Sequence, residues 1–234
     1  MTEAVMAKQI FFIAGTDTDA GKTFIASGLL AKAKQAQLST LGLKPVAAGC
    51  SETDQGLRND DAMKLMTQST VQLSYEQVNP IALQPAIAPH IAAQRIRKPL
   101  SAERIVGLLR GVLMTNKAEF TLIEGAGGYR VPLNPRETLA DCIKELRTPV
   151  VLVVGMKLGC LNHALLTVEA IKRDGLHIAG WVANQIDPAM SAYDENIETL
   201  RAMIPAPCLG VVPHIDNNTA EAAAEYLTLP SMEG

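Results

Sequence analysis

Residues 15–23 read Gly-Thr-Asp-Thr-Asp-Ala-Gly-Lys-Thr and directly follow the apolar run Ile-Phe-Phe-Ile-Ala at residues 10–14. An apolar strand that enters a glycine-rich turn and then a helix is the layout of a phosphate-binding loop, whose backbone N–H groups cradle phosphate oxygens. In such a loop Lys22 would reach the β- and γ-phosphates, and the Thr23 hydroxyl would ligate Mg²⁺. An ordinary turn that happens to contain Gly-Lys-Thr is disfavoured, because the strand pattern before it and the helix pattern after it both match the layout of a phosphate-binding loop. The gap between the glycines is one residue longer than in the common pattern.

The composition indicates a single α/β domain over residues 1–234, without internal repeats or linkers. The net charge of −3 argues against nucleic acid or an acidic membrane surface as the main partner. The first seven residues have no apolar core, and the apolar run at 150–156 is too short to span a bilayer. We therefore expect a soluble, cytoplasmic protein. Its four cysteines form no Cys-x-x-Cys pair, so reduced thiols are expected and zinc is not.

Strand and helix patterns alternate along the chain. We expect strands at residues 8–14, 40–44, 120–123, 150–154, 178–182 and 208–212, and helices at 22–35, 59–66, 90–95, 101–114, 162–174, 196–204 and 219–226. The segments 45–58 and 79–89 are expected to be irregular. This order predicts an α/β fold with a mostly parallel sheet flanked by helices, like that of P-loop nucleoside triphosphate hydrolases. Ligands of such sheets bind beyond the carboxyl ends of the strands.

Two charged residues stand at the ends of expected strands. Lys44 precedes Pro45, which stops its strand. This lysine could neutralise a carboxylate or a transferring phosphoryl group, but the position suits a solvated surface lysine equally well. Glu124 closes a buried strand and opens Gly125-Ala126-Gly127-Gly128. An acid at that place in a nucleotide-binding fold usually binds Mg²⁺ directly or through its second coordination sphere, and the glycines let a backbone approach a ligand closely. An exposed glutamate at a strand end is the less favoured alternative.

Two further groups give weaker signals. Asp61 follows Asp60 at a helix start, where acidic residues are common because they suit the helix dipole, and the pattern alone favours that capping role. The tetrad Asn184-Gln185-Ile186-Asp187 follows a strand, and an amide side chain can bond both edges of a purine. The tetrad is also similar to the guanine-reading Asn-Lys-x-Asp motif of GTPases. An Asn-Asp turn is the plain alternative, so the base remains open.

The histidines indicate little chemistry. His163 lies in an apolar helical stretch and is expected to be a packing residue, while His90 after Pro89 is expected at a helix start. None has a serine or cysteine partner at an arguable spacing, so the sequence gives no support for nucleophilic catalysis.

Together these motifs resemble the dethiobiotin synthetases of the biotin pathway, over essentially the whole chain. The resemblance is carried by residues 15–23, 44–47 (Lys-Pro-Val-Ala), 56–59 (Gly-Leu-Arg-Asn), 78–80 (Val-Asn-Pro), 89–90 (Pro-His), 124–128 (Glu-Gly-Ala-Gly-Gly), 153–164 and 180–184 (Gly-Trp-Val-Ala-Asn). The longer gap in the phosphate loop is itself a mark of that family. Each motif alone is weak, but the set is highly specific.

The resemblance implies an ATP-dependent ligase that closes a cyclic urea from 7,8-diaminopelargonate and CO₂, giving dethiobiotin, ADP and phosphate. One amine would capture CO₂ as a carbamate, whose oxygen attacks the γ-phosphorus. The second amine would then close the ring on the mixed carbamic–phosphoric anhydride and expel phosphate. An anionic carbamate must approach an anionic triphosphate, and lysines with Mg²⁺ would offset that repulsion.

The resemblance also implies site residues. It gives catalytic roles to Lys44, Lys22 and Thr18, and Mg²⁺ ligation to Thr23, Asp61 and Glu124, which replaces the capping role of Asp61. The implied ATP contacts are Asp19, Ala20, Gly21, Lys22, Thr23, Phe24, Asp61, Glu124, Gly125, Ala126, Gly127, Asn184, Gln185 and Pro213. The implied substrate contacts are Thr18, Lys44, Ala48, Gly159, Cys160 and Asn162. The stretch 159–162 matches a helix N-terminus that receives the substrate carboxylate across a subunit boundary, so a homodimer is implied.

Two positions depart from the family pattern. Ala48 stands where members often have a serine that touches the substrate. A tyrosine near the carboxylate tail has no clear counterpart, since both Tyr193 and Asn196 are candidates. These differences leave details of substrate binding open, but not the reaction.

Three other functions compete with this interpretation. An amidating cobyrinate synthase would need a glutaminase-like domain, for which the chain is short. A switch-type P-loop ATPase of the partitioning or septum-site class would need a lysine early in the phosphate loop and a basic or amphipathic tail. Residues 16–20 contain no lysine, and the tail from 221 to 234 is acidic. A GTPase is suggested only by the tetrad at 184–187.

Overall fold

The computed structural model describes residues 8–216 and 218–231 of the chain. Within these residues a six-stranded sheet has the order β10-β9-β8-β1-β7-β2, and all its pairings are parallel. Its strands are β1 (Gln9–Gly15), β2 (Thr40–Leu43), β7 (Phe120–Glu124), β8 (Val150–Met156), β9 (Ile178–Gln185) and β10 (Cys208–Val212). Parallel neighbours need crossover connections, which the intervening helices supply. The prediction of a parallel sheet flanked by helices is confirmed.

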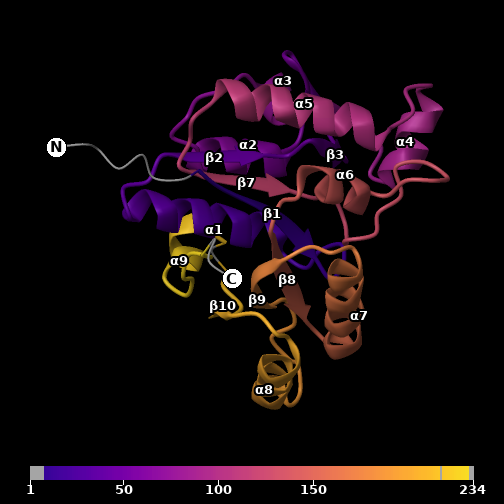
Figure 1. The fold of residues 1–234 in the computed structure, drawn as a ribbon. Helices are drawn as coiled ribbons and strands as arrows, with labels where there is room; N and C mark the ends of the chain where they lie inside the picture. Colours follow the sequence, from indigo (N-terminus) through magenta and orange to yellow (C-terminus); the bar gives the residue numbers. More distant parts are fainter. Residues whose placement is uncertain (1–7, 217, 232–234) are drawn as a thin grey trace.

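Helices cover both faces of this sheet (Figure 1). Those in the described residues are α1 (Lys22–Gln35), α2 (Asp60–Gln68), α3 (Tyr75–Val78), α4 (Pro89–Arg95), α5 (Ala102–Thr115), α6 (Leu139–Leu146), α7 (Cys160–Arg173), α8 (Tyr193–Met203) and α9 (Ala220–Ala224). On one face Phe11 of β1 packs in a core cluster with Ile25 and Leu29 of α1. The next residue, Phe12, belongs to a second cluster with residues of α5, α6, α7 and α8. Because the sheet is buried on both faces, its strands read as continuous apolar runs. No helix of the described part is long and apolar enough to cross a membrane.

Short strands lie inside the two segments that were expected to be irregular. β3 (Val46–Ala48) pairs with β6 (Ile81–Leu83), and β4 (Ser51–Thr53) forms a hairpin with β5 (Gly56–Arg58). The expectation is wrong at these places because three-residue strands are too short to show a period of two.

Helix boundaries also differ from the expected ones. Helices α3 and α6 were not anticipated, although both begin with capping boxes, Ser74 with Gln77 and Thr138 with Asp141. Helix α7 begins earlier than its apolar pattern, and the residue before it, Gly159, has φ 95°. A left-handed residue there fixes the helix start, which the apolar pattern alone does not reveal.

Helix α9 lies against α1, although nearly the whole chain separates them in sequence (Figure 1). A Cβ on Gly28 of α1 would lie 2.6 Å from Cβ of Ala223 and 2.9 Å from Cδ1 of Leu227. Both separations are too short for a real contact, so this glycine lets the two segments meet closely. Because α1 leads out of the phosphate loop, the contact braces the helix that presents the loop.

We predict that Gly28→Ala lowers the free energy of unfolding by about 1–3 kcal/mol, because the new methyl group overpacks this contact. The control is Gly107→Ala in α5, where nothing lies within 4 Å of such a Cβ. That change should raise the free energy of unfolding by about 0.5–1 kcal/mol, the usual gain of alanine over glycine in a helix. Urea titrations of both variants measure this, and a stabilised Gly28→Ala protein would contradict the packing argument.

Candidate active site

A cleft of about 1110 Å³ opens at the carboxyl ends of β1, β2 and β7, where open α/β sheets bind their ligands. The predicted site residues that line it are Thr18, Asp19, Gly21, Lys22, Thr23, Phe24, Lys44, Ala48, Asp61, Glu124, Ala126 and Gly127. The structure thus brings together the phosphate loop at the end of β1, the charged groups at the ends of β2 and β7, and one carboxylate of α2. Ala20, Gly125, Gly159, Cys160, Asn162, Asn184, Gln185 and Pro213 do not line this cleft.

The phosphate loop joins β1 to α1 and presents a buried ammonium group. Nζ of Lys22 donates to the carbonyl oxygen of Asp17 at 3.3 Å, and Lys22 is only 7% exposed. Burial, helped by the positive charge of Lys44, lowers the pKa of Lys22. Lys22 forms no ion pair with any residue that the structure describes. A buried cation without a carboxylate partner, beside a glycine-rich turn, is suited to bind an anion.

The second lysine is buried among carboxylates. Nζ of Lys44 lies 2.6 Å from Oε1 of Glu124 and 3.1 Å from Oδ2 of Asp61, and it donates to the Gly125 carbonyl at 3.0 Å. Burial acts to lower the pKa of Lys44, but the two carboxylates outweigh it, so the pKa is raised and the ammonium stays charged. Lys44 is 4% exposed, which excludes the solvated-surface interpretation.

Asp61 reaches this cluster from the first turn of α2. The N-cap of the helix is Asn59, whose side chain accepts from the N–H of Ala62 at 3.2 Å. The capping role that the pattern favoured for Asp61 is therefore wrong, because the cap lies two residues earlier and Asp61 faces Lys44. Burial acts to raise the pKa of Asp61, but the charge of Lys44 and the hydrogen bonds from Thr23 and Lys44 lower it.

Glu124 has one oxygen engaged and one free. Oε1 accepts from the Thr23 hydroxyl at 2.8 Å and from Lys44, while Oε2 is buried and has no hydrogen-bond partner among the described residues. A buried carboxylate oxygen without a partner is costly unless something binds it. The Thr23 hydroxyl and the carboxylates of Asp61 and Glu124 are the hard oxygen donors that Mg²⁺ prefers. The residues present therefore fit a divalent cation next to the phosphate loop.

Asn184 contacts the phosphate loop from the side of β9. Its Nδ2 donates to the carbonyl oxygen of Ala20 at 3.0 Å, and the residue is 5% exposed. A Cβ on Gly21, which has φ 86°, would lie 2.0 Å from that nitrogen, so only glycine fits there. Oε1 of the next residue, Gln185, accepts from the backbone N–H of His214, which follows Pro213. Asn184, Gln185 and Pro213 therefore lie next to the phosphate loop without lining the large cleft.

The start of α7 does not line the cleft. Gly159 has open space around it, Cys160 is buried, and Leu158 is 95% exposed. The cleft is instead lined by Leu166, Thr167 and Ala170 from the later turns of the same helix. Within one chain, the predicted carboxylate-binding stretch at 159–162 therefore stays apart from the predicted catalytic lysines.

Sequence reasoning identified the glycines after Glu124 but missed the two residues that follow them. Tyr129 and Arg130 line the cleft and both bind Asp174, the C-cap of α7, at 2.7 and 2.9 Å respectively. The loop that follows Glu124 is thereby tied to the far end of α7. An aromatic residue and a cation directly after Gly-Gly were the available signal.

The packing role expected for His163 is wrong. Its side chain is 43% exposed, and Nδ1 lies 4.0 Å from Oδ2 of Asp17, an oxygen that also pairs with Nζ of Lys157 at 3.3 Å. Burial acts to raise the pKa of Asp17, but Lys157 and the N–H of Thr18 lower it. These contacts join the phosphate loop to the β8–α7 connection. No local pattern reveals them, because they depend on the pairing of β1 with β8.

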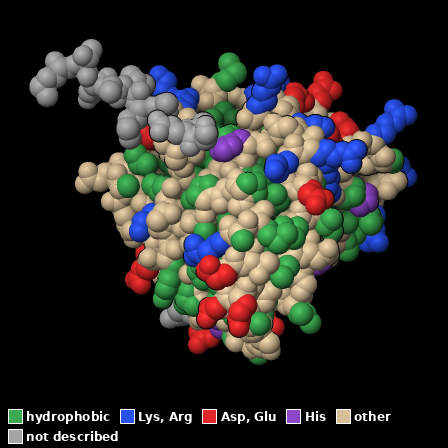
Figure 2. Space-filling view, turned by 60° about the horizontal axis from the view of Figure 1, so that its bottom comes forward, with side chains coloured by type: hydrophobic (Ala, Val, Ile, Leu, Met, Phe, Trp, Pro, Cys, Tyr) green, Lys and Arg blue, Asp and Glu red, His purple; other side chains and the backbone are tan. Residues whose placement is uncertain are grey.

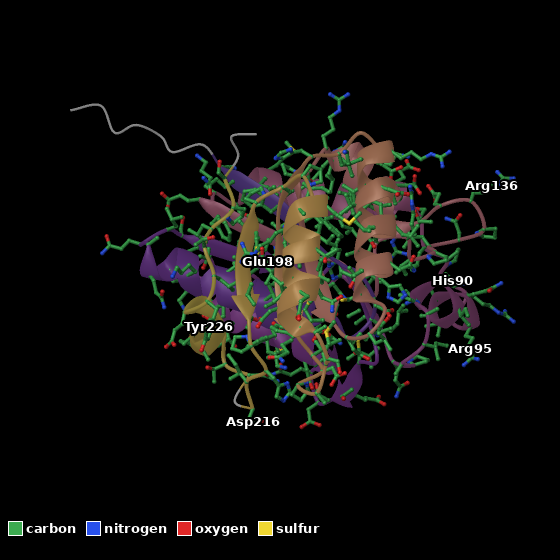
Figure 3. All side chains as sticks on the ribbon, turned by 90° about the horizontal axis from the view of Figure 1, so that it is seen from below. His90, Arg95, Arg136, Glu198, Asp216 and Tyr226 are labelled. Atoms are coloured by element: carbon green, nitrogen blue, oxygen red, sulfur yellow. The ribbon has the colours of Figure 1, made fainter. Side chains whose placement is uncertain are left out.

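Helix α4 forms one rim of the cleft. Residues 86–89 line the cleft, and His90 stands in the first turn of α4 as expected. Figure 3 shows His90 and Arg95 on the same side of the molecule as Arg136, whereas Tyr226 of the C-terminal segment lies on the opposite side. Asn134 donates to the Leu100 carbonyl at 3.1 Å, which fastens the loop near Arg136 to the segment after α4.

Known structures share the fold. A ParA family ATPase from Chlorobium tepidum superposes with a TM-score of 0.57 at 13% identity, covering 94% of this chain and 91% of that one. The septum site-determining protein MinD from Pyrococcus horikoshii, solved with Mg-ADP, gives a TM-score of 0.54 at 18% identity over 96% of this chain and 87% of its own. At such identities the likeness establishes the P-loop ATPase fold and nothing more.

Sequence relatives are much closer. A family model described as an AAA domain matches residues 9–222. The ATP-dependent dethiobiotin synthetase of Cellvibrio japonicus is 62% identical over 224 residues, covering 96% of this chain and 97% of the relative. The ATP-dependent dethiobiotin synthetase of Pseudomonas aeruginosa is 57% identical over 219 residues, covering 94% and 96% respectively. With its phosphate loop and the charged cleft beside it, the chain belongs to the family of ATP-dependent dethiobiotin synthetases.

Proposed function

We propose that this protein joins CO₂ to the vicinal diamine 7,8-diaminopelargonate at the expense of ATP, giving dethiobiotin, ADP and phosphate. The observation that carries the proposal is the single cleft that holds Lys22, Lys44 and Glu124 in a chain of this family. Two buried ammonium groups next to a phosphate loop can bring an anionic acceptor up to an anionic triphosphate.

The reaction proceeds in three balanced steps. One amine of the diamine adds to CO₂ and loses a proton, which gives a carbamate. A carbamate oxygen attacks the γ-phosphorus, and the bond to ADP breaks, which leaves a mixed carbamic–phosphoric anhydride. The second amine attacks the carbamoyl carbon, loses a proton and expels phosphate, which closes the ureido ring. No protein nucleophile is required at any step.

The chain positions charge rather than forming covalent bonds. Lys22, which has no ion-pair partner among the described residues, binds phosphate oxygens, and Lys44 neutralises the carbamate and the transferring phosphoryl group. Thr18 lines the same cleft and orients the carbamate by hydrogen bonding, and Ala48 leaves the substrate a backbone contact in place of a side-chain hydroxyl. One such charge typically accounts for about 10²–10³ in rate.

Thr23, Asp61 and Glu124 would hold Mg²⁺ in this protein. Bound there, the cation would neutralise the developing charge on the triphosphate oxygens. The unpartnered oxygen of Glu124 supports this assignment.

ATP is held by the loop and by residues next to it. Asp19, Ala20, Gly21, Lys22, Thr23 and Phe24 enclose the phosphates, with Gly125, Ala126 and Gly127 on the facing loop. Asn184, Gln185 and Pro213 surround the adenine, and the position of the Asn184 amide against the Ala20 carbonyl supports that assignment. We also propose that the protein works in the cytoplasm, on small molecules.

A switch-type ATPase acting on DNA or membrane is not favoured. The net charge is −3, and on the face shown in Figure 2 basic and acidic side chains are interspersed rather than gathered in a basic stripe. Counterion release from nucleic acid requires clustered lysine and arginine.

A homodimer completes the substrate site in this proposal. The stretch at 159–162 starts a helix of 14 residues, and a helix N-terminus binds carboxylates well. Because this stretch does not line the cleft of its own chain, the carboxylate of the diamine would be bound by the copy from the partner subunit. The exposed Leu158 and Leu166 supply apolar surface for the contact between subunits.

We predict that ADP release requires both bicarbonate and the diamine, and that mass spectrometry finds dethiobiotin as the product. GTP in place of ATP tests the base. Lys44→Ala serves as the negative control and should lose about 10²-fold or more of the turnover, because it removes the ammonium that neutralises the carbamate and the transferring phosphoryl group. Turnover that ignores the diamine but rises with DNA or lipid vesicles would favour the switch instead.

We predict a dimer in solution whose active sites depend on both chains. Sedimentation velocity with activity measured across a dilution series tests this, and turnover should fall where the dimer dissociates. An active monomer would overturn the shared site and leave the reaction itself unaffected.

A further inference from the structure

Two side chains, Tyr75 and Asn79, and the backbone N–H of Asn59 form a buried hydrogen-bond chain beside the cleft. The Tyr75 hydroxyl donates to Oδ1 of Asn79 at 2.9 Å and accepts from the backbone N–H of Asn59 at 2.7 Å. Tyr75 and Asn59 are 7% exposed and Asn79 is 2% exposed. One hydroxyl thus joins two sequence motifs, Leu-Arg-Asn at 57–59 and Val-Asn-Pro at 78–80, neither of which supplies a proposed contact to the reacting groups.

One end of this chain holds the backbone of Lys44. The pairing of β2 with β7 stops one residue before Lys44, and Pro45 follows it, so the peptide groups of Lys44 need other partners. The N–H of Lys44 donates to the Val78 carbonyl at 2.9 Å, and Nδ2 of Asn79 donates to the Lys44 carbonyl at 2.6 Å. Both backbone polar groups of this lysine are therefore held by residues 78 and 79.

The other end fixes the start of the helix that bears Asp61. Asn59 caps α2 through Oδ1, and its Nδ2 donates to the Ala48 carbonyl at 3.5 Å. Its own N–H is held by Tyr75. The Tyr75 hydroxyl therefore links the end of β2, through Asn79, to the start of α2, through the backbone of Asn59. Their two charged side chains, Lys44 and Asp61, meet at 3.1 Å in the cleft.

We propose that Tyr75 and Asn79 are positioning residues that keep Lys44 and Asp61 in register for phosphoryl transfer, an inference that rests on the proposed function of that site. Lys44 follows β2 and Asp61 lies in α2, and the β3–β5 segment separates the two along the chain. Additional contacts are therefore needed to hold these two side chains at a fixed distance from each other. Displacements of about 1 Å at reacting groups cost up to about 10²-fold in rate. The Tyr75–Asn79–Asn59 hydrogen-bond chain holds the two elements together, and its two proposed positioning residues, Tyr75 and Asn79, do not line the cleft.

The test is Tyr75→Phe, which removes the hydroxyl and keeps the ring that packs against the Arg58 guanidinium at 4.1 Å. We expect kcat to fall about tenfold, in line with losses when groups behind a reactive centre are removed. We also expect a higher Mg²⁺ concentration for half-maximal binding of a non-hydrolysable ATP analogue, measured by calorimetry, because Asp61 shifts.

The matched control is Thr40→Val at the opposite end of the same strand and helix. The Thr40 hydroxyl is fully buried, donates to the Gln68 carbonyl at 2.8 Å and accepts from the N–H of Thr70 at 3.1 Å. This variant also loses a buried hydroxyl, so both proteins should show similarly lowered thermal midpoints. In Thr40→Val we expect kcat and the Mg²⁺ dependence of ATP-analogue binding to equal those of the unmodified protein. In Tyr75→Phe we expect both to change.

Parental kinetics and Mg²⁺ dependence in Tyr75→Phe, or equal changes in both variants, would overturn the positioning role and reduce the network to a stabilising one. Failure of the parent protein to form dethiobiotin would instead count against the proposed function. The calorimetric comparison needs no turnover, so it would still decide whether Tyr75 acts on the cation site.

Discussion

The site depends on the ion pairs that the buried Lys44 ammonium forms with Glu124 and Asp61. A charge removed from water must be paired, and taking away one partner of a buried pair is strongly destabilising. The pairing therefore ties together the ends of β2 and β7 and the first turn of α2. It also keeps Lys44 charged, which is what a group that meets phosphate requires.

Lys22 and Lys44 face Asp61 and Glu124 in the cleft, so their positive charge already has carboxylates beside it. A bound triphosphate would add negative charge there. Thr23, Asp61 and Glu124 would hold a divalent cation, which would compensate that charge when bound. Lys44 would then supply the remaining positive charge beside the phosphates.

The fold and part of the site can be predicted from local patterns in the sequence. The contacts that complete the site cannot, because they depend on how distant segments pack together. The phosphate loop, the strand ending at Glu124 and the alternation of elements are continuous in sequence, so periodicity and glycine spacing identify them. Whether Lys44 was buried or solvated could not be decided locally, because its partners lie at residues 61 and 124. The contact of Asp17 with His163 likewise joins segments far apart in the chain. The hydrogen bonds of Tyr75 with residues 59 and 79 span shorter distances in sequence, but no periodic pattern indicates them.

The most direct measurement of the central claim is a crystal structure with a non-hydrolysable ATP analogue and Mn²⁺, located by its anomalous signal. The account predicts the metal against Thr23, Asp61 and Glu124, and the terminal phosphate within hydrogen-bond distance of both Lys22 and Lys44. A terminal phosphate remote from the two lysines, or a metal bound elsewhere, would contradict it.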